Sequence, residues 1–157
     1  SEGDNGGFES SAAEIAAACD CDVEELHDRV GRCGPLGYAR SVLEAVTRFD
    51  TLLKPSQHDP ARYGLVVVGT PVWFWNLSSP VRTWVRRHRA KLGDVAFFCT
   101  CGSSGERRAL AEFEALCGRA VASLALTDRE VDTGRHVGKL DAFVAQLAPT
   151  GRRQAAR

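Results

Sequence analysis

The run from Leu65 to Val68, ended by Gly69, constrains the fold of this chain more than any other stretch of its sequence. Four consecutive apolar residues leave no polar face, as expected of a parallel strand that helices cover on both sides. We therefore predict a central strand of an α/β sheet at this position.

A helix is predicted to follow this strand after a short loop. Ser78 and Ser79 can cap its first turn, and Pro80 suits a position where a backbone N–H would have no partner. The apolar residues that recur at helical spacing are Val81, Trp84, Val85 and Leu92. The strand, the loop and the helix together form the start of a βαβ unit.

The same alternation recurs toward the C-terminus. Strands are predicted at Val95 to Thr100 and at Val121 to Leu126, with Asp128 to Gly134 as a long connection. Two helices are predicted from apolar residues at helical spacing. The first buries Leu110, Phe113 and Cys117, and the second is marked by Val137, Leu140, Val144 and Leu147. Strands spaced about 30 residues apart with right-handed crossovers give a doubly wound parallel sheet, so the predicted fold class is α/β.

The N-terminal third carries weaker patterns. Ser11 and Glu14 form a capping box before a first helix, preceded by a loop or frayed end over Ser1 to Phe8. Further elements are predicted as a short strand at Asp22 to Leu26, a loop at Gly31 to Gly37, a helix marked by Tyr38, Val42, Ala45 and Phe49, and a linker at Lys54 to Pro60.

Composition restricts the classes of protein that fit. The 157 residues, 44% hydrophobic and 25% charged, suffice for one domain with a core, which we assign to residues 1–149 with a polar tail at 150–157. A net charge of zero disfavours a polyanion-binding surface. The sequence has neither a long apolar run nor a basic segment before an apolar one, so we predict no membrane span, no secretory signal and a cytoplasmic location. It contains no methionine, so its initiation site is expected to lie outside it.

The six cysteines are expected to be reduced thiols, because the chain is larger and more apolar than disulfide scaffolds. Cys19 with Cys21, and Cys99 with Cys101, could together offer four thiolates to a metal. Their C-x-C spacing differs from the two-residue gap of zinc knuckles, and we predict no metal site. Cys19 and Cys117 fall on apolar helix faces, where a buried thiol needs no function.

The loop from Thr70 to Leu77 is the first candidate for a ligand site. It carries Trp73 and Trp75 at the carboxyl end of the predicted strand, the edge where open α/β sheets bind ligands. The two indoles could stack on a planar, electron-poor ligand, or they could close the end of the core. The loop alone leaves both alternatives open.

Three segments resemble the flavodoxin family, in particular its short single-domain flavodoxins and flavodoxin-like bacterial reductases. They are GTPVWFWNLSSPVRTWV at Gly69 to Val85, FFCTCGSSGERRALAEFEALCG at Phe97 to Gly118, and LTDREVDTG at Leu126 to Gly134. The resemblance spans nearly the whole chain. It implies a three-layer sandwich around a five-stranded parallel sheet of order 2-1-3-4-5, with FMN at the strand ends.

The resemblance also implies which residues hold FMN. Trp73 or Trp75 would stack on the isoalloxazine, and backbone amides of the second loop would face its pyrimidine end, where glycines let the backbone approach. The implied cofactor-binding residues are Thr70, Pro71, Val72, Trp73, Phe74, Trp75, Asn76, Thr100, Cys101, Gly102, Ser103 and Gly105. No catalytic side chain is implied, because the flavin carries the redox chemistry.

The sequence departs from the family at its front. Asn5, Gly6, Gly7 and Phe8 stand where the family has its T-G-N-T phosphate loop, and the first strand is absent. Either the sequence begins downstream of the real start, or the phosphate site has been lost, or another chain fills the gap. Ser10 and Ser11 could supply hydroxyls, although Asp4 and Glu9 would repel a phosphate.

The sequence supports two functions. The first is an FMN-binding protein in electron transfer or an FMN-dependent oxidoreductase, with a redox protein or NAD(P)H as its electron partner and a homodimer as an allowed assembly. The alternative is a flavodoxin-fold protein without FMN that serves as an interaction or small-ligand module. A basic helix with Arg82, Arg86 and Arg89 on one face is expected to be solvated, and it fits an acidic redox partner better than nucleic acid.

Overall fold

The computed structural model describes residues 6–26, 56–72 and 75–155, with residues 149–155 described by their backbone only. Three parallel strands form one sheet: β1 (Leu65–Pro71), β2 (Asp94–Cys101) and β3 (Ala122–Thr127), in the order β1-β2-β3. All three lie where the sequence predicts strands, which confirms an α/β fold. Within the described sheet, however, β2 and not β1 is the central strand.

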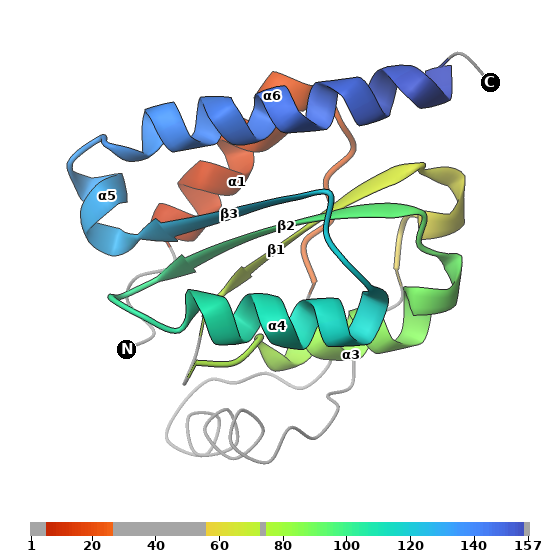
Figure 1. Cartoon of the computed structure of the whole chain (residues 1–157), viewed down its shortest axis with the longest axis horizontal. Coiled ribbons are helices and arrows are strands. Elements are labelled where there is room, and N and C mark those ends of the chain that lie inside the picture. Colours follow the sequence, from red (N-terminus) through yellow and green to blue (C-terminus); the bar gives the residue numbers. More distant parts are fainter. Residues whose placement is uncertain (1–5, 27–55, 73–74, 156–157) are drawn as a thin grey trace.

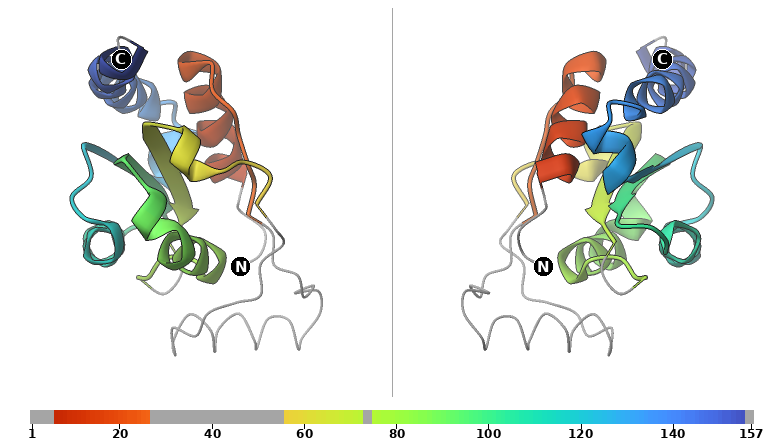
Figure 2. Two further views of the ribbon diagram at one scale, coloured as in Figure 1. Left: turned by 90° about the vertical axis from the view of Figure 1, so that its right-hand side faces the viewer. Right: turned by 90° about the vertical axis from the view of Figure 1, so that its left-hand side faces the viewer.

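The helices cover both faces of this sheet. Helices α1 (Gly6–Cys19) and α6 (His136–Ala155) lie on one face, and α3 (Ser79–His88) and α4 (Glu106–Cys117) lie on the other (Figure 1). The end-on views of Figure 2 show the same three layers. Because β2 is covered on both sides, every one of its residues after Asp94 is buried.

Successive side chains of β2 enter two separate cores. Val95, Phe97 and Cys99 pack in the core under α3 and α4, where the Phe97 and Phe113 rings stack at 4.8 Å. Ala96 and Phe98 pack in the other core, together with Ile15 of α1 and with Leu140, Phe143 and Leu147 of α6. This alternation explains why the strand reads as a continuous apolar run.

Helix α3 confirms the predicted helix and corrects its ends. Val81, Trp84 and Val85 are buried as expected, but Leu92 follows a separate 3₁₀ turn, η2 (Arg89–Lys91). Ser78 is the N-cap residue, yet its hydroxyl makes no capping bond and lies 3.0 Å from the Thr70 hydroxyl. The cap therefore ties the helix start to the end of β1.

Three predictions in the N-terminal segment are wrong, and the first is the loop over Ser1 to Phe8, whose last three residues are helical. Helix α1 begins at Gly6, so Ser11 lies inside it, buried, and its hydroxyl donates to the Gly7 carbonyl oxygen at 2.8 Å instead of capping. Residues 21–26 form no strand: the Glu24 carboxylate instead accepts bonds from the Gln57 and His58 amides at 3.0 and 3.1 Å. The Glu24 side chain, and not strand pairing, therefore connects residues 21–26 to Gln57 and His58.

The connection predicted at Asp128 to Gly134 contains a short helix, α5 (Asp128–Asp132). A capping box forms it: the Thr127 hydroxyl accepts from the Glu130 amide at 3.2 Å, and the Glu130 carboxylate accepts from the Thr127 amide at 2.9 Å. The last helix is also longer than predicted. It runs to Ala155, so most of the expected polar tail at 150–157 is helical.

Other predictions lie outside the described residues, namely the loop at Gly31 to Gly37 and the helix through Tyr38, Val42, Ala45 and Phe49. The full 2-1-3-4-5 strand order and the missing first strand stay predictions. Among the residues that the structure describes, no helix has both the length and the apolar character needed to cross a membrane.

Gly69 yields the first testable prediction. A Cβ atom at this position would lie 2.1 Å from Phe98 Cε1, and the Phe98 ring is itself stacked on Phe8 at 5.1 Å. Because that ring has little room to move, we expect Gly69→Ala to lower the free energy of unfolding by about 1–3 kcal/mol. Urea denaturation measures this difference.

Gly138→Ala is the matched control. Gly138 lies in α6, and apart from its own helix backbone and chain neighbours no atom of the described residues lies within 4 Å of the Cβ atom that Ala would add. The same substitution should therefore raise stability by about 0.5–1 kcal/mol through helix propensity. Equal effects at the two positions would contradict the role of the Phe98 ring.

Glu130 yields a pH-dependent prediction. The Lys139 ammonium, 2.5 Å away, and the Thr127 amide lower the pKa of Glu130 from 4.5 to about 2. A lowered folded pKa contributes stability above the unfolded pKa that is lost as the pH falls. Since the side chain is 23% exposed, we expect Glu130→Gln to cost only about 1 kcal/mol at neutral pH.

This cost should shrink as the pH falls from 4.5 toward about 2. Unfolding curves of parent and Glu130→Gln across this range check the prediction. A cost that is independent of pH would contradict it.

Candidate functional site

The candidate site lies at the carboxyl edge of the sheet. The parallel register places Pro71 of β1 beside Thr100, and Cys101 of β2 beside Thr127. The Val72 amide then donates to the Thr100 carbonyl oxygen at 2.8 Å. The loops that follow β1 and β2 therefore leave the sheet side by side, as ligand-binding loops of open α/β sheets do.

Trp75 joins these two loops. The residue is 57% exposed, and its indole Nε1 donates to the Ser104 hydroxyl at 3.3 Å. Its backbone has φ 61°, the left-handed conformation that non-glycine residues rarely adopt. The exposed indole and the strained backbone mark the loop as a candidate functional feature.

Gly105 is required at this junction for two reasons. Its φ of 108° disfavours any side chain, and a Cβ there would lie 2.8 Å from Trp75 Cδ1 and 3.1 Å from Val72 Cγ1. The loop from Gly102 to Gly105 can pack against Trp75 only because this side chain is absent. Together the Trp75 side chain and residues Gly102–Gly105 form a surface that we call the rim.

The sequence-predicted binding residues divide by exposure. Trp75, Gly102 and Ser103 are exposed, while Pro71, Val72 and Gly105 are half-buried. The buried members are Thr70, Asn76, Thr100 and Cys101. Trp73 and Phe74 lie outside the described residues. Among the described members, the exposed residues, with Ser104 beside them, are the most accessible to a ligand at the rim.

A buried ion pair anchors the loop after Trp75. Arg82 has 0% relative exposure, and its Nε lies 3.1 Å from Glu112 Oε1. Its Nη2 donates to the Leu77 carbonyl oxygen at 3.2 Å, while Glu112 Oε2 accepts from the Leu77 amide at 3.1 Å. Both backbone groups of Leu77 are thus held by one ion pair.

The prediction that Arg82 lies on a solvated face is therefore wrong. Its partner Glu112 comes from α4, so the local helical pattern of α3 could not reveal it. Around the rim, Glu112 and Ser104 are functional candidates that the sequence analysis does not identify. Ser104 stood inside the recognised CGSSG loop, whereas Glu112 had no comparable signal.

The exposed cations of the same helix lie at the wrong edge for the rim. Arg86, Arg87, Arg89 and Lys91 are at the end of α3 and in η2, just before β2 begins. Because α3 starts at the carboxyl edge and returns, these residues lie at the amino edge of the sheet (Figure 1). A partner bound there would not contact the rim.

The first turn of α1 is where the family resemblance implies a phosphate loop. The Ser11 hydroxyl donates to the Gly7 carbonyl oxygen, and Ser10 lies 3.5 Å from the Glu14 carboxylate. Glu9 adds a negative charge in this turn. The described residues of α1 therefore favour a phosphate group neither by hydroxyl donors nor by charge.

The described cysteines are all free thiols. Burial raises the pKa of Cys99 to about 12 and that of Cys117 to about 11, so both stay protonated at neutral pH. The described residues bring together no group of three or more side chains able to hold a metal ion. The four-thiolate arrangement considered from the sequence is not formed among them.

Comparisons with solved structures identify the class of fold. A flavoprotein from Lactobacillus acidophilus, crystallised in complex with FMN, matches with a TM-score of 0.62 and 20% identity over 80% of this chain and 88% of that one. Its apo form, solved by NMR, matches with a TM-score of 0.60 and 22% identity over 81% and 88% of the two chains.

A third structure, of a predicted flavoprotein from Bacteroides eggerthii, has a TM-score of 0.68 and 17% identity over 88% of this chain and 91% of that one. No protein-family model and no curated protein matches the sequence. At these identities the likeness shows the fold alone. The chain has a flavodoxin-like α/β fold, which confirms the predicted fold class.

Glu112 yields a prediction about the anchor of the loop. Glu112→Gln keeps an acceptor for the Leu77 amide but leaves the buried Arg82 charge without its carboxylate. We expect the free energy of unfolding to fall by about 3–5 kcal/mol, the usual cost of breaking a buried pair. Urea denaturation at neutral pH measures it.

Glu114→Gln on the same helix is the matched control. Glu114 accepts a bond from the Ala120 amide at 3.1 Å, as Glu112 does from Leu77, and it is half-buried. Because no ion pair of Glu114 occurs among the described residues, we expect a loss of at most about 0.5 kcal/mol. Similar losses in the two variants would argue against the ion pair as the anchor.

Proposed function

We propose that this protein binds FMN at the rim and uses it in a redox function, either electron transfer or an FMN-dependent oxidoreductase reaction. The observation that carries the proposal is the exposed Trp75 indole beside the exposed Gly102–Ser104 backbone at the carboxyl edge of the sheet. The FMN complex of the structurally similar Lactobacillus acidophilus flavoprotein supports it.

The rim fits the ring system of a flavin. The Trp75 side chain offers an aromatic face for stacking. Gly102 and Gly105 bring backbone close to that face without side chains between, and the amides of this loop can donate to the polar end of a ring. When bound, FMN supplies the electron-accepting and electron-donating chemistry.

The chain's own contribution would be to position and shield the ring. Trp75 would stack on it, the Gly102–Gly105 backbone would hydrogen-bond to it, and both would exclude water from one face. The left-handed backbone at Trp75 costs about 1–2 kcal/mol. The Arg82–Glu112 pair and the Trp75–Ser104 bond hold the loop in that conformation against this cost.

The electron partner in this proposal is a redox protein or NAD(P)H that approaches the rim. A homodimer and a cytoplasmic location are compatible with the proposal and are not required by it. The basic end of α3 is disfavoured as the docking surface for electron transfer, because it lies at the opposite edge of the sheet.

The second candidate is a flavodoxin-fold protein that binds no FMN and serves as an interaction or small-ligand module. The observation that favours it is the first turn of α1, where Ser11 is bonded internally and Glu9 carries a negative charge. The side chains of this turn therefore offer the FMN phosphate neither a hydroxyl donor nor a positive charge. A flavin titration separates the two candidates.

The titration yields a prediction about Trp75. We expect the purified protein to quench FMN fluorescence saturably, and Trp75→Ala to weaken the affinity about tenfold through loss of stacking. Trp75→Phe retains an aromatic ring and should recover most of that loss. No quenching by the parent protein would refute FMN binding, and unchanged affinity in Trp75→Ala would refute stacking on this indole.

The same titration with riboflavin isolates the phosphate group. Because the described part of α1 provides no free hydroxyl and one carboxylate at its start, we expect riboflavin to bind within about tenfold of FMN. A much stronger preference for FMN would mean that residues outside the described part recognise the phosphate.

A further inference from the structure

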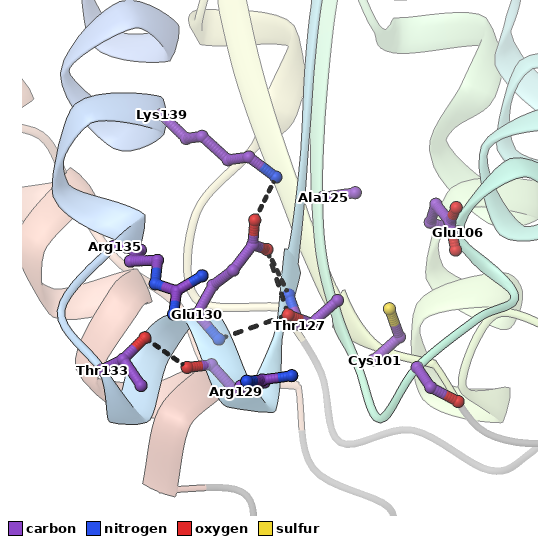
Figure 3. Close-up of a pocket in the computed structure, with 10 residues that line it drawn as sticks. Cys101, Glu106, Ala125, Thr127, Arg129, Glu130, Thr133, Arg135 and Lys139 are labelled. Atoms are coloured by element: carbon purple, nitrogen blue, oxygen red, sulfur yellow. Dashed lines mark hydrogen bonds and ion pairs between the residues drawn. The ribbon is translucent and has the colours of Figure 1, made fainter.

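A cavity lies beside the Gly102–Gly105 loop and has Cys101, Ser103 and Glu106 in its lining. It measures about 330 Å³ and opens at the carboxyl ends of β2 and β3, between the start of α4 and the α5 region (Figure 3). We call it the β3 cavity. Ser103 lines it, but none of the described residues of the Thr70–Leu77 loop does.

The charges that line the β3 cavity do not balance. Three cations, Arg129, Arg135 and Lys139, face two carboxylates, Glu106 and Glu130. Lys139 pairs with Glu130 at 2.5 Å, and Glu130 also accepts bonds from Thr127. These two charges satisfy each other. Arg129 and Arg135 then remain with the carboxylate of Glu106 in the lining, and the carboxylate of Asp128 lies near the cavity beside Gly102 and Cys101.

Arg129 and Arg135 are available to a ligand. Both side chains are exposed, and neither guanidinium group forms an ion pair or hydrogen bond with another described residue. In Figure 3 the Arg129 side chain extends beneath Thr127, and the Arg135 side chain comes from the turn before α6 and lies beside Glu130. Two unpaired guanidinium groups at one cavity suit an oxyanion, which each can bind through two N–H groups.

Two further residues of the cavity lining, Ser103 and Cys101, favour ligand binding over covalent chemistry. The Ser103 hydroxyl is exposed and forms no hydrogen bond with another described residue, so it can donate to a ligand. Burial and the carboxylates of Glu106, Asp128 and Glu130 raise the pKa of the Cys101 thiol, which outweighs the opposing effect of Lys139. Cys101 therefore stays a neutral thiol at the cavity wall.

We propose that the β3 cavity binds a small organic anion through its carboxylate or phosphate group, separately from any flavin at the rim. Arg129 and Arg135 hold the oxyanion, and the Ser103 hydroxyl contributes a further donor. The volume of about 330 Å³ is at the lower end of small-molecule sites, which leaves room for an organic body beyond the oxyanion. Glu106 across the cavity can accept a hydrogen bond from that body.

An NMR titration of the ¹⁵N-labelled protein without flavin tests the proposal. Succinate and inorganic phosphate are added in separate experiments, with sodium chloride at matched ionic strength as the reference. We expect saturable shifts of the Ser103 and Thr127–Arg135 amides at roughly millimolar concentrations. The relative affinities of the two probes tell whether the arginines prefer carboxylate or phosphate.

Paired charge-matched variants make the test specific. We expect Arg129→Gln with Arg135→Gln to weaken the binding of the better probe about tenfold. Arg107→Gln with Arg119→Gln removes the same charge from two exposed arginines that do not line the cavity, and it should change affinity less than about twofold. Shifts that match those in sodium chloride, or equal losses in both double variants, would overturn the proposal.

Running the anion titration both without and with FMN tests this proposal independently of the proposed function. The anion titration is read on the flavin-free protein, so it can succeed even if FMN does not bind. When FMN quenching is observed, repeating the anion titration at saturating FMN should leave the affinity for the anion unchanged within about twofold. Displacement of the anion by FMN would overturn the claim of a separate site.

Discussion

The ion pair of Arg82 and Glu112 is the interaction on which the geometry of the rim depends. It connects α3 to α4, and it bonds both the amide and the carbonyl oxygen of Leu77, where the Trp75 loop returns to the core. Burying two charges is costly, and an apolar pair of similar size could stabilise the helices equally well. A guanidinium and a carboxylate, however, can also bond a backbone segment that would otherwise be buried without partners.

The layered fold was predictable because its signals are local. β2 is apolar at nearly every position since helices cover both of its faces, and that run is legible in the sequence. The start of α1 was misjudged because a serine can cap a helix or bond back within it, and Ser11 does the second. Helix α5 was missed although Thr127 and Glu130 carry the spacing of a capping box.

The candidate site was predictable only in part, because its geometry depends on contacts between elements distant in sequence. The two loops were recognised from Trp75 and the CGSSG segment, but the sequence did not show that Gly105 must remain small to accommodate Trp75 and Val72. The sequence predicts a solvated Arg82 because Arg82 shares a helix face with Arg86 and Arg89, opposite the apolar residues Val81 and Val85. The burial of that charge depends on Glu112, 30 residues further along the chain.

The Gly102–Gly105 loop separates two surfaces of different chemistry. Ser104 faces the aromatic rim through its bond to Trp75, while its neighbour Ser103 lines the β3 cavity with its arginines. Successive side chains of one short loop thus contact two sites, since the backbone turns between them. The parallel strands bring the rim and the β3 cavity close together. Because β1, β2 and β3 all end at the carboxyl edge of the sheet, the segments that follow them begin at that edge.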